Sequence, residues 1–343
     1  MKEPSRIYWL DYGKAVSMLL IILFHVCIYY VGKTDFLVDI LFYNTSIAFF
    51  FFANGYVSKI QNFDFKGSMM SILKRLLIPY LIFTSIIFIP KQLARGNDFD
   101  VFSMMYEIFG GIASWFVAAL IVSRLALSVI LKYTDNIKRV GLFSFILLII
   151  GLFMSNYLDS PVPWNANYGF ISLFYIYLGI ICKKYEVYFN KHIKLQLVIS
   201  TVLYLVFYVA NFYLLKETQF ASLYVYKLSP GGVNLLGIFT YTLLSVTGLW
   251  MLGSWMKILP PKIKWLSYIG KNSLVYYYLN TGVILVLTIL LNKFGYPYDG
   301  KYAVYYALFI VVVLVLSVVT GLINRFAPWM VGDFRNRKRI PNG

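Results

Sequence analysis

Apolar residues are grouped into ten long runs that recur almost to the C-terminus of the chain. Most runs are near the roughly 20 residues that an α-helix needs to cross the hydrocarbon core of a bilayer. The pattern therefore predicts an all-α fold, a polytopic membrane bundle of about ten transmembrane helices. The predicted spans are 14–31, 36–57, 72–89, 112–131, 140–157, 168–182, 195–215, 233–255, 271–291 and 303–323.

The distribution of positive charges supports this number of spans. If the N-terminus lies in the cytoplasm and the connecting segments alternate sides, the six inside segments hold 24 of the 31 Lys and Arg residues. The five outside segments hold the other seven. Such a cytoplasmic excess is the positive-inside rule, and a missed or extra span would scramble it. We therefore expect both termini in the cytoplasm and a multi-pass protein of the cell inner membrane.

Composition excludes several other classes of protein. Hydrophobic residues make up 60% of the chain and charged residues 13%, whereas soluble domains carry about 25% charged residues. The net charge of +17 follows from the positive-inside rule, so no nucleic-acid partner is expected. Cys27 and Cys182 both fall in apolar helices, so we expect neither a disulfide framework nor a metal site. We expect one membrane domain over 1–343, with a core at about 6–325 and a short basic cytoplasmic tail at 326–343.

The first predicted span places an acid, a base and an imidazole on one helix face. Lys14 and His25 are eleven residues apart, which is three helical turns plus about 20°, and about 16 Å along the axis. Asp11 lies about 40° from His25 on the same stripe. Ionisable residues in hydrocarbon are costly and are functional candidates by default.

Two interpretations of His25 are open at this point. A buried imidazole stays neutral, because desolvation disfavours its charged form, and a neutral imidazole can remove a proton from an attacking hydroxyl. Alternatively, His25 packs between helices and bonds to a Ser, a Tyr or a backbone carbonyl. The other histidine, His192, lies in a basic inside loop.

Basic residues also gather near the predicted inside rim: Lys74 and Arg75 open the third span, with Lys14 and Arg124 at similar depth. Cationic side chains at this depth can hold an anionic ligand such as a phosphate. They can equally be stop-transfer residues that snorkel to the interface.

Two further stretches carry polar or aromatic residues. Trp115 begins the fourth span on the outside, where an interfacial anchor is the ordinary explanation. Ser273, Tyr276, Tyr277 and Asn280 fit one polar face of the ninth span. A polar face within a span indicates helix–helix hydrogen bonds or the lining of a cavity.

Six stretches occur in order along the chain: WLDYGKAVSMLLIILFH, FFFFANGYVSK, LKRLLIPY, SWFVAALIVSRL, FYIYLGIICKKY and IGKNSLVYYYLN. In this order, on ten spans, they resemble the acyltransferase 3 family of integral membrane O-acyltransferases, over about residues 6–325. The resemblance implies an enzyme that moves an acyl group, commonly acetyl from acetyl-CoA, onto a hydroxyl. Typical acceptors are sugars of surface polysaccharides, lipopolysaccharide or peptidoglycan, and sometimes lipids. The family's essential histidine maps onto His25 and its basic partner onto Lys14.

The chain departs from the family's pattern at three of these motifs, and at one of them the small Ser-Gly pair of the second span is here Asn54-Gly55. The family often has two arginines three apart before the third span. Here Arg75 matches the second, Ile72 occupies the first, and Lys74 lies nearby. The family often ends the ninth-span motif in histidine, where this chain has Asn280, so His25 is the only histidine in a predicted span.

The resulting hypothesis is an O-acetyltransferase that acts on a sugar hydroxyl, with His25 as general base and Asp11 or another polar partner orienting the site. Transient acetylation of His25 is a second route. Acetyl-CoA would be a co-substrate from the cytoplasm, and no bound cofactor is expected. Its phosphates would meet the cations Lys14, Lys74, Arg75 and Arg124. The acceptor cavity would be lined by Trp115, Ser273, Tyr277 and Asn280.

A transporter or flippase for a lipid or sugar is the alternative, with His25 and Asp11 in a proton relay. The absence of a carboxylate deep in any predicted span argues against a proton-coupled carrier. The expected partners are the bilayer, acyl-CoA and a carbohydrate or lipid-linked sugar acceptor. No fused extracytoplasmic domain is expected, which leaves room for a separate extracytoplasmic partner protein.

Overall fold

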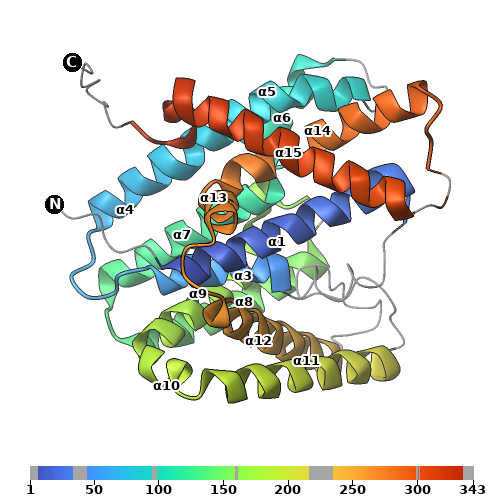
Figure 1. Cartoon of the computed structure of the whole chain (residues 1–343). Coiled ribbons are helices and arrows are strands. Elements are labelled where there is room, and N and C mark those ends of the chain that lie inside the picture. The colour runs from blue at the N-terminus through green and yellow to red at the C-terminus, as the bar shows by residue number, and fades with distance from the viewer. Residues whose placement is uncertain are drawn as a thin grey trace, which may run out of the picture.

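The computed structural model describes residues 7–33, 45–94, 99–158, 161–215, 235–298, 300 and 302–334. Within these ranges the chain is almost entirely helical and contains no strand (Figure 1). Eight of the described helices are long and apolar enough to cross a membrane. The all-α, polytopic membrane bundle is thereby confirmed, while the exact number of spans and the side of the termini stay predictions.

Each of the ten predicted spans overlaps an apolar helix of the structure. Residues 36–44, at the start of the second predicted span, lie outside the described residues. The matching helices are α1 (Tyr8–Val26) with its π-helical continuation η1 (Cys27–Val31), α3 (Ile47–Tyr56), the continuous run of α4 (Phe65–Ile72), π-helical η3 (Leu73–Leu77) and α5 (Ile78–Ala94), α7 (Trp115–Tyr133), α8 (Ile137–Tyr157), α9 (Ala166–Lys184), α11 (Ile193–Leu215), α12 (Leu235–Ile258), α14 (Ser273–Lys293) and α15 (Tyr302–Phe326).

Several short helices were not predicted from the apolar pattern. They are α6 (Val101–Phe109), α10 (Glu186–Asn190), α13 (Lys264–Lys271) and the 3₁₀ turns η4 (Pro163–Asn165) and η5 (Pro328–Val331). α6 begins where the Asp100 carboxylate accepts hydrogen bonds from the backbone N–H groups of Phe102 and Ser103. Such N-capping satisfies helix-end donors that have no intrahelical partner.

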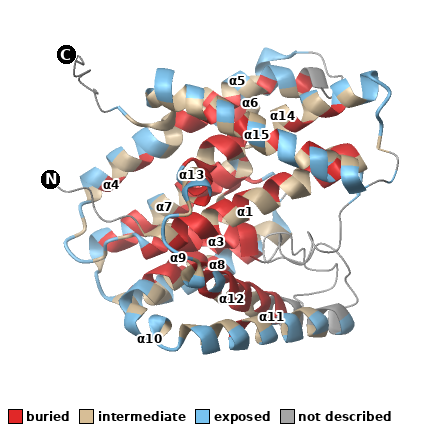
Figure 2. Ribbon diagram, viewed as in Figure 1, coloured by how far each residue is buried: buried red, intermediate tan, exposed pale blue. Residues whose placement is uncertain are grey.

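Large apolar side chains remain exposed on the outward faces of the peripheral helices (Figure 2). Phe143 in α8, Val198 in α11 and Val318 in α15 are examples. A water-soluble monomer rarely exposes such continuous apolar surface, whereas lipid tails accommodate it without cost. These faces are the lipid-facing surface of the bundle.

Glycines allow α3 and α9 to pack closely at the centre of the bundle. A Cβ atom on Gly55 would lie 1.8 Å from the carbonyl oxygen of Ile176, and one on Gly179 would lie 2.1 Å from that of Phe52. Small residues permit this approach of backbones in membrane proteins. Gly270 similarly brings α13 against the first turns of α1, because a Cβ there would lie 1.9 Å from the carbonyl oxygen of Asp11.

We predict that Gly55→Ala destabilises the fold by about 1–3 kcal/mol, because the added methyl meets backbone that cannot move without separating two helices. Thermal unfolding of the detergent-purified protein measures the effect. Gly321→Ala in α15 is the matched control, since its Cβ would lie at an ordinary 3.5 Å from the Tyr268 hydroxyl. Equal stability of the two variants would show that the α3–α9 contact adjusts freely.

Candidate active site

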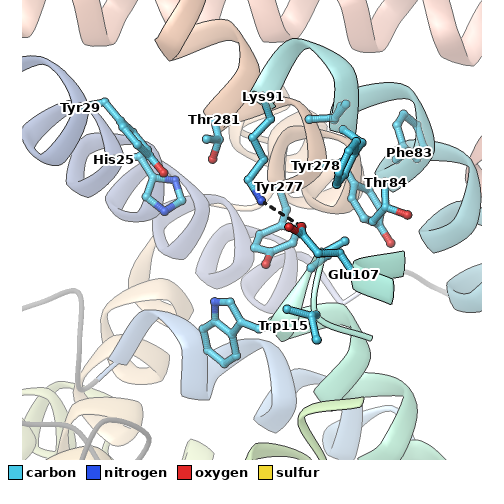
Figure 3. Close-up of a pocket in the computed structure, with 15 residues that line it drawn as sticks. His25, Tyr29, Phe83, Thr84, Lys91, Glu107, Trp115, Tyr277, Tyr278 and Thr281 are labelled. Carbon is cyan, nitrogen blue, oxygen red and sulfur yellow. Dashed lines mark ion pairs between the residues drawn. The ribbon is translucent and has the colours of Figure 1, made fainter. Parts of the chain in front are cut away.

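His25 lies in the last turn of α1, directly before the π-helical turn η1. Its ring is half-buried and forms part of a cavity wall (Figure 3). A π-helical turn inside a long helix is uncommon and occurs frequently at functional sites. Another π-helical segment, η3, contains Lys74 and Arg75.

The imidazole of His25 is oriented by Asn280 of α14. Nδ1 of His25 lies 2.5 Å from Oδ1 of Asn280. The amide N–H₂ of Asn280 donates to the carbonyl oxygens of Tyr276 and Tyr277, so the amide oxygen is the atom that faces the histidine. An amide oxygen can only accept a hydrogen bond, so Nδ1 carries the hydrogen and the lone pair is on Nε2.

The cavity beside His25 has a volume of 290 Å³. It lies between α1, α5, α14 and the segment that joins α6 to α7, and we call it the outer cavity because the predicted topology puts these helix ends outside. Aromatic and hydroxyl side chains dominate its wall: Tyr29, Phe83, Thr84, Ser114, Trp115, Tyr277, Tyr278 and Thr281. Their mixture of flat apolar faces and hydroxyl groups suits a polar ligand that also has apolar surface.

An ion pair that the sequence analysis missed also lines the outer cavity. Nζ of Lys91 lies 3.9 Å from a carboxylate oxygen of Glu107, and both side chains point into the cavity (Figure 3). The side chains are 22% and 25% exposed, so a ligand can reach both charges. Only the exposed apolar positions of α6, spaced as on one helix face, could have indicated that Glu107 points inward.

A second and larger cavity of 830 Å³ lies nearer the N-terminal ends of α14 and of the continuous run from α4 to α5, and we call it the inner cavity. Its cations are Lys74 and Arg75 of η3 and Lys271 at the end of α13. The ion pairs of the described residues leave these three without a carboxylate partner. Gly332 closes one side, where a Cβ would lie 2.3 Å from the carbonyl oxygen of Lys74.

The two cavities share helix α14. Leu274 and Val275 line the inner cavity, and Tyr277 and Tyr278 line the outer cavity. Two residues of helix rise by about 3 Å, so little more than half a helical turn separates the two walls. The continuous run from η3 to α5 also contributes to both. A thin ligand arm would therefore have a short distance to cross between the cavities.

The structure separates Asp11 from His25. Asp11 is buried and forms an ion pair of 2.9 Å with Lys14. Fourteen residues of helix put Asp11 about 21 Å from His25 along the axis. Side chains on one helix face meet only when they are three or four residues apart, so Asp11 does not orient His25. The other polar partner that was expected is Asn280.

The remaining predicted site residues fall in different places. Trp115 and Tyr277 line the outer cavity, and Lys74 and Arg75 line the inner cavity. Arg124 donates a hydrogen bond of 3.3 Å to the hydroxyl of Ser58 and lines neither cavity. Ser273 is buried, and Lys14 and Ser273 also lie outside both walls. Among the described residues, no group of three His, Cys, Asp or Glu side chains is placed to hold a metal ion.

We predict that His25 is found as the Nδ1–H tautomer. Nitrogen-15 NMR of histidine-labelled protein measures this directly, and His192→Asn leaves His25 as the single histidine signal. Asn280→Leu removes the acceptor and should yield a mixture of tautomers. A dominant Nε2–H form in the parent protein would contradict the assignment of the hydrogen bond.

Comparison with known proteins agrees with this architecture. The family model described as an acyltransferase domain, acyltransferase 3, matches residues 7–322 of the 343. The searches of curated proteins and of solved structures each found no match. The matched region contains His25, Asn280 and both cavity-lining sets of cations and aromatic residues. The chain belongs to the acyltransferase 3 family and is a multi-pass membrane acyltransferase.

Proposed function

We propose that the protein transfers an acetyl or other short acyl group from acyl-CoA to a hydroxyl of a sugar, in a surface polysaccharide or a glycolipid precursor, with His25 as general base. The observation that carries this proposal is the hydrogen bond from His25 to Asn280. It leaves the lone pair of Nε2 available on the wall of a cavity that can admit a hydroxyl.

The proposed reaction begins when Nε2 of His25 takes the proton of the acceptor hydroxyl as its oxygen attacks the thioester carbonyl carbon. The carbon–sulfur bond then breaks, and coenzyme A leaves as a thiolate that takes the proton back from the imidazolium. The products are an O-acyl ester and the free thiol, with His25 neutral again. Asn280 supports the imidazolium, because its partly negative oxygen stays on Nδ1–H throughout.

A second route uses the same lone pair as a nucleophile. Nε2 of His25 attacks the thioester first, the thiolate leaves, and the acceptor hydroxyl then attacks the acyl-imidazole. Both routes require a neutral imidazole with Nδ1 protonated. The proton-relay alternative is less well supported, because Asp11 is engaged by Lys14 at a distance from His25.

The inner cavity is the proposed site for the coenzyme A nucleotide. Lys74, Arg75 and Lys271 supply cations for its phosphates, with a guanidinium that binds phosphate bidentately. The predicted topology opens this cavity to the cytoplasm, where acyl-CoA is found. The pantetheine arm would then pass the short stretch of α14 that separates the two cavities.

The outer cavity is the proposed acceptor site. Trp115 offers a flat face for a sugar ring, while Lys91 and Glu107 offer a donor and an acceptor for its hydroxyl groups. With the predicted topology, the acceptor is modified at the outer face of the inner membrane. Packing of the helices around the acyl arm would keep water from the thioester.

We predict that His25→Ala lowers acyl transfer by at least about 100-fold, the lower range for loss of a general base. Transfer of labelled acetyl from acetyl-CoA is measured in membranes with matched protein levels and added candidate glycans. His192→Asn, in the loop before α11, is the control histidine variant and should match the wild type. Equal labelling by His25→Ala and the wild type would show that the histidine has a structural role. If the wild type left acetyl-CoA intact with every acceptor tested, the proposed activity would be overturned.

A separate prediction concerns the donor. Arg75→Gln should raise the Kd for acetyl-CoA by about tenfold or more, because a charge-assisted hydrogen bond to phosphate contributes about 1.5–3 kcal/mol. Calorimetry with purified protein measures binding without turnover. Lys66→Gln, an exposed cation of α4 outside the inner cavity, is the control. An unchanged Kd for Arg75→Gln would place the coenzyme elsewhere.

A further inference from the structure

A third pocket, of 170 Å³, lies apart from the proposed reaction path. It lies between α1, α3, α9, α10, α11 and α12, and shares no lining residue with the outer or inner cavity. Aromatic and aliphatic carbon dominates its wall, which includes Trp9, Tyr56, Leu178, Cys182, Leu249 and Trp250.

The polar atoms at the edge of this pocket are largely engaged by the protein. Nε1 of Trp250 donates to Oε1 of Gln196, and Nε2 of Gln196 donates to the carbonyl oxygens of Tyr188 and Lys191. Water inside would find few partners, and apolar cavities of this kind stay dry or take up apolar ligands. An engineered cavity of about 150 Å³ admits benzene, so this pocket has room for part of one hydrocarbon chain.

Lys257, at the end of α12, adds a positive charge to the lining of the pocket. Its Nζ lies 4.8 Å from the centroid of the Trp9 ring and 2.8 Å from Oδ1 of Asn190, and both of these partners are neutral. The nearby carboxylate of Glu186 lies closer to another cation, in an ion pair of 2.5 Å with Lys183. The pocket therefore combines an apolar slot with one cation, Lys257, that has no carboxylate within ion-pair distance among the described residues.

Glu186 stays ionised in this arrangement. Burial opposes its charge, but the hydrogen bond from Lys183 and the positive charges of Lys183 and Lys257 more than offset burial, and the pKa of the carboxyl group is lowered. The Lys183–Glu186 pair is thus retained at neutral pH.

The pocket lies at a seam of the bundle. α11 packs along α12, and this hairpin meets the core through contacts of α12 with α1 and α3 (Figure 1). The ends of α9 and α12 that carry Lys183 and Lys257 belong to predicted inside segments, as do Lys184 and Lys191. Basic residues at the cytoplasmic interface attract anionic lipids.

We propose that this pocket binds part of one acyl chain of an anionic phospholipid of the cytoplasmic leaflet, with the headgroup phosphate at Lys257. The bilayer supplies such a lipid at the pocket. The acyl chain of the lipid matches the apolar wall, and its phosphate matches the positive charge of Lys257. The bound chain fills the seam between α9 and α12 and stabilises the docking of the α11–α12 hairpin. The site does not depend on the proposed catalytic activity.

Native mass spectrometry of the delipidated protein tests the proposal, with phosphatidylglycerol and phosphatidylcholine of identical chains as probes. We expect phosphatidylglycerol to bind at least about tenfold more tightly and to raise the melting temperature. Lys257→Gln should remove the headgroup preference but keep binding. Lys138→Gln, an exposed cation near the start of α8, is the control. Equal affinity of the parent protein for the two lipids would overturn the proposal.

Gly253→Leu tests the pocket itself. A Cβ at Gly253 meets Trp9 at an ordinary 3.7 Å, so a longer side chain extends into the pocket without striking backbone. This variant should lose high-affinity binding of phosphatidylglycerol, whereas Gly321→Leu should keep it. Undiminished binding by a folded Gly253→Leu protein would contradict the assigned site.

The native thiols give a readout that needs no substitution. Cys182 lines the pocket and is partly accessible, whereas Cys27 is buried. Phosphatidylglycerol should slow the reaction of Cys182 with maleimide at the concentrations that give the mass-spectrometric adduct. No protection would overturn the proposal, as would stronger protection by palmitoyl-CoA, which would identify a site for a long acyl donor chain.

Discussion

The hydrogen bond between His25 and Asn280 joins two helices that are 255 residues apart in the sequence. It connects α1, which contacts α3, α12, α13, α14 and α15, with the helix that lines both cavities. The bond makes a polar group tolerable inside the bundle, because it pairs Nδ1 of His25 with Oδ1 of Asn280. It also decides which ring nitrogen remains available. This one hydrogen bond therefore helps to hold the two helices together, and it also leaves the lone pair of Nε2 available, as the proposed chemistry requires.

The bilayer imposes a second constraint on the arrangement of charge. Cations without a carboxylate partner among the described residues gather at the inner cavity, and the ion pair of Lys91 and Glu107 lies in the outer cavity. The wall of α14 between them is carried by Leu274, Val275 and aromatic residues. In the proposed function, charged groups of the ligands bind at either end, and a neutral, thin arm passes the region between the cavities. This division of charge between the two cavities matches the proposed acyl-CoA donor, whose charged phosphates and reactive thioester lie at opposite ends of the molecule.

The apolar runs were sufficient to predict the helices, because length and hydropathy determine what can cross a bilayer. They did not predict α6 or the inward direction of Glu107, since a short amphipathic helix between spans carries a weak apolar signal. Spacing along α1 placed Asp11 and His25 on one stripe but could not identify their partners. The partner of Asp11 lies on α1 itself, and the partner of His25 lies on α14. Contacts between helices depend on how the helices pack, and spacing along the sequence does not reveal that packing.

Asn280 shows why a departure from a family pattern need not weaken a site. A histidine at this position could present either a donor or an acceptor to His25, so two tautomers would be compatible with the contact. Asparagine has an oxygen and an amino group, and the helix carbonyls of Tyr276 and Tyr277 take the amino hydrogens. Only the oxygen is left for His25. Asn280 therefore favours the Nδ1–H tautomer of His25, which is the form that the proposed general base requires.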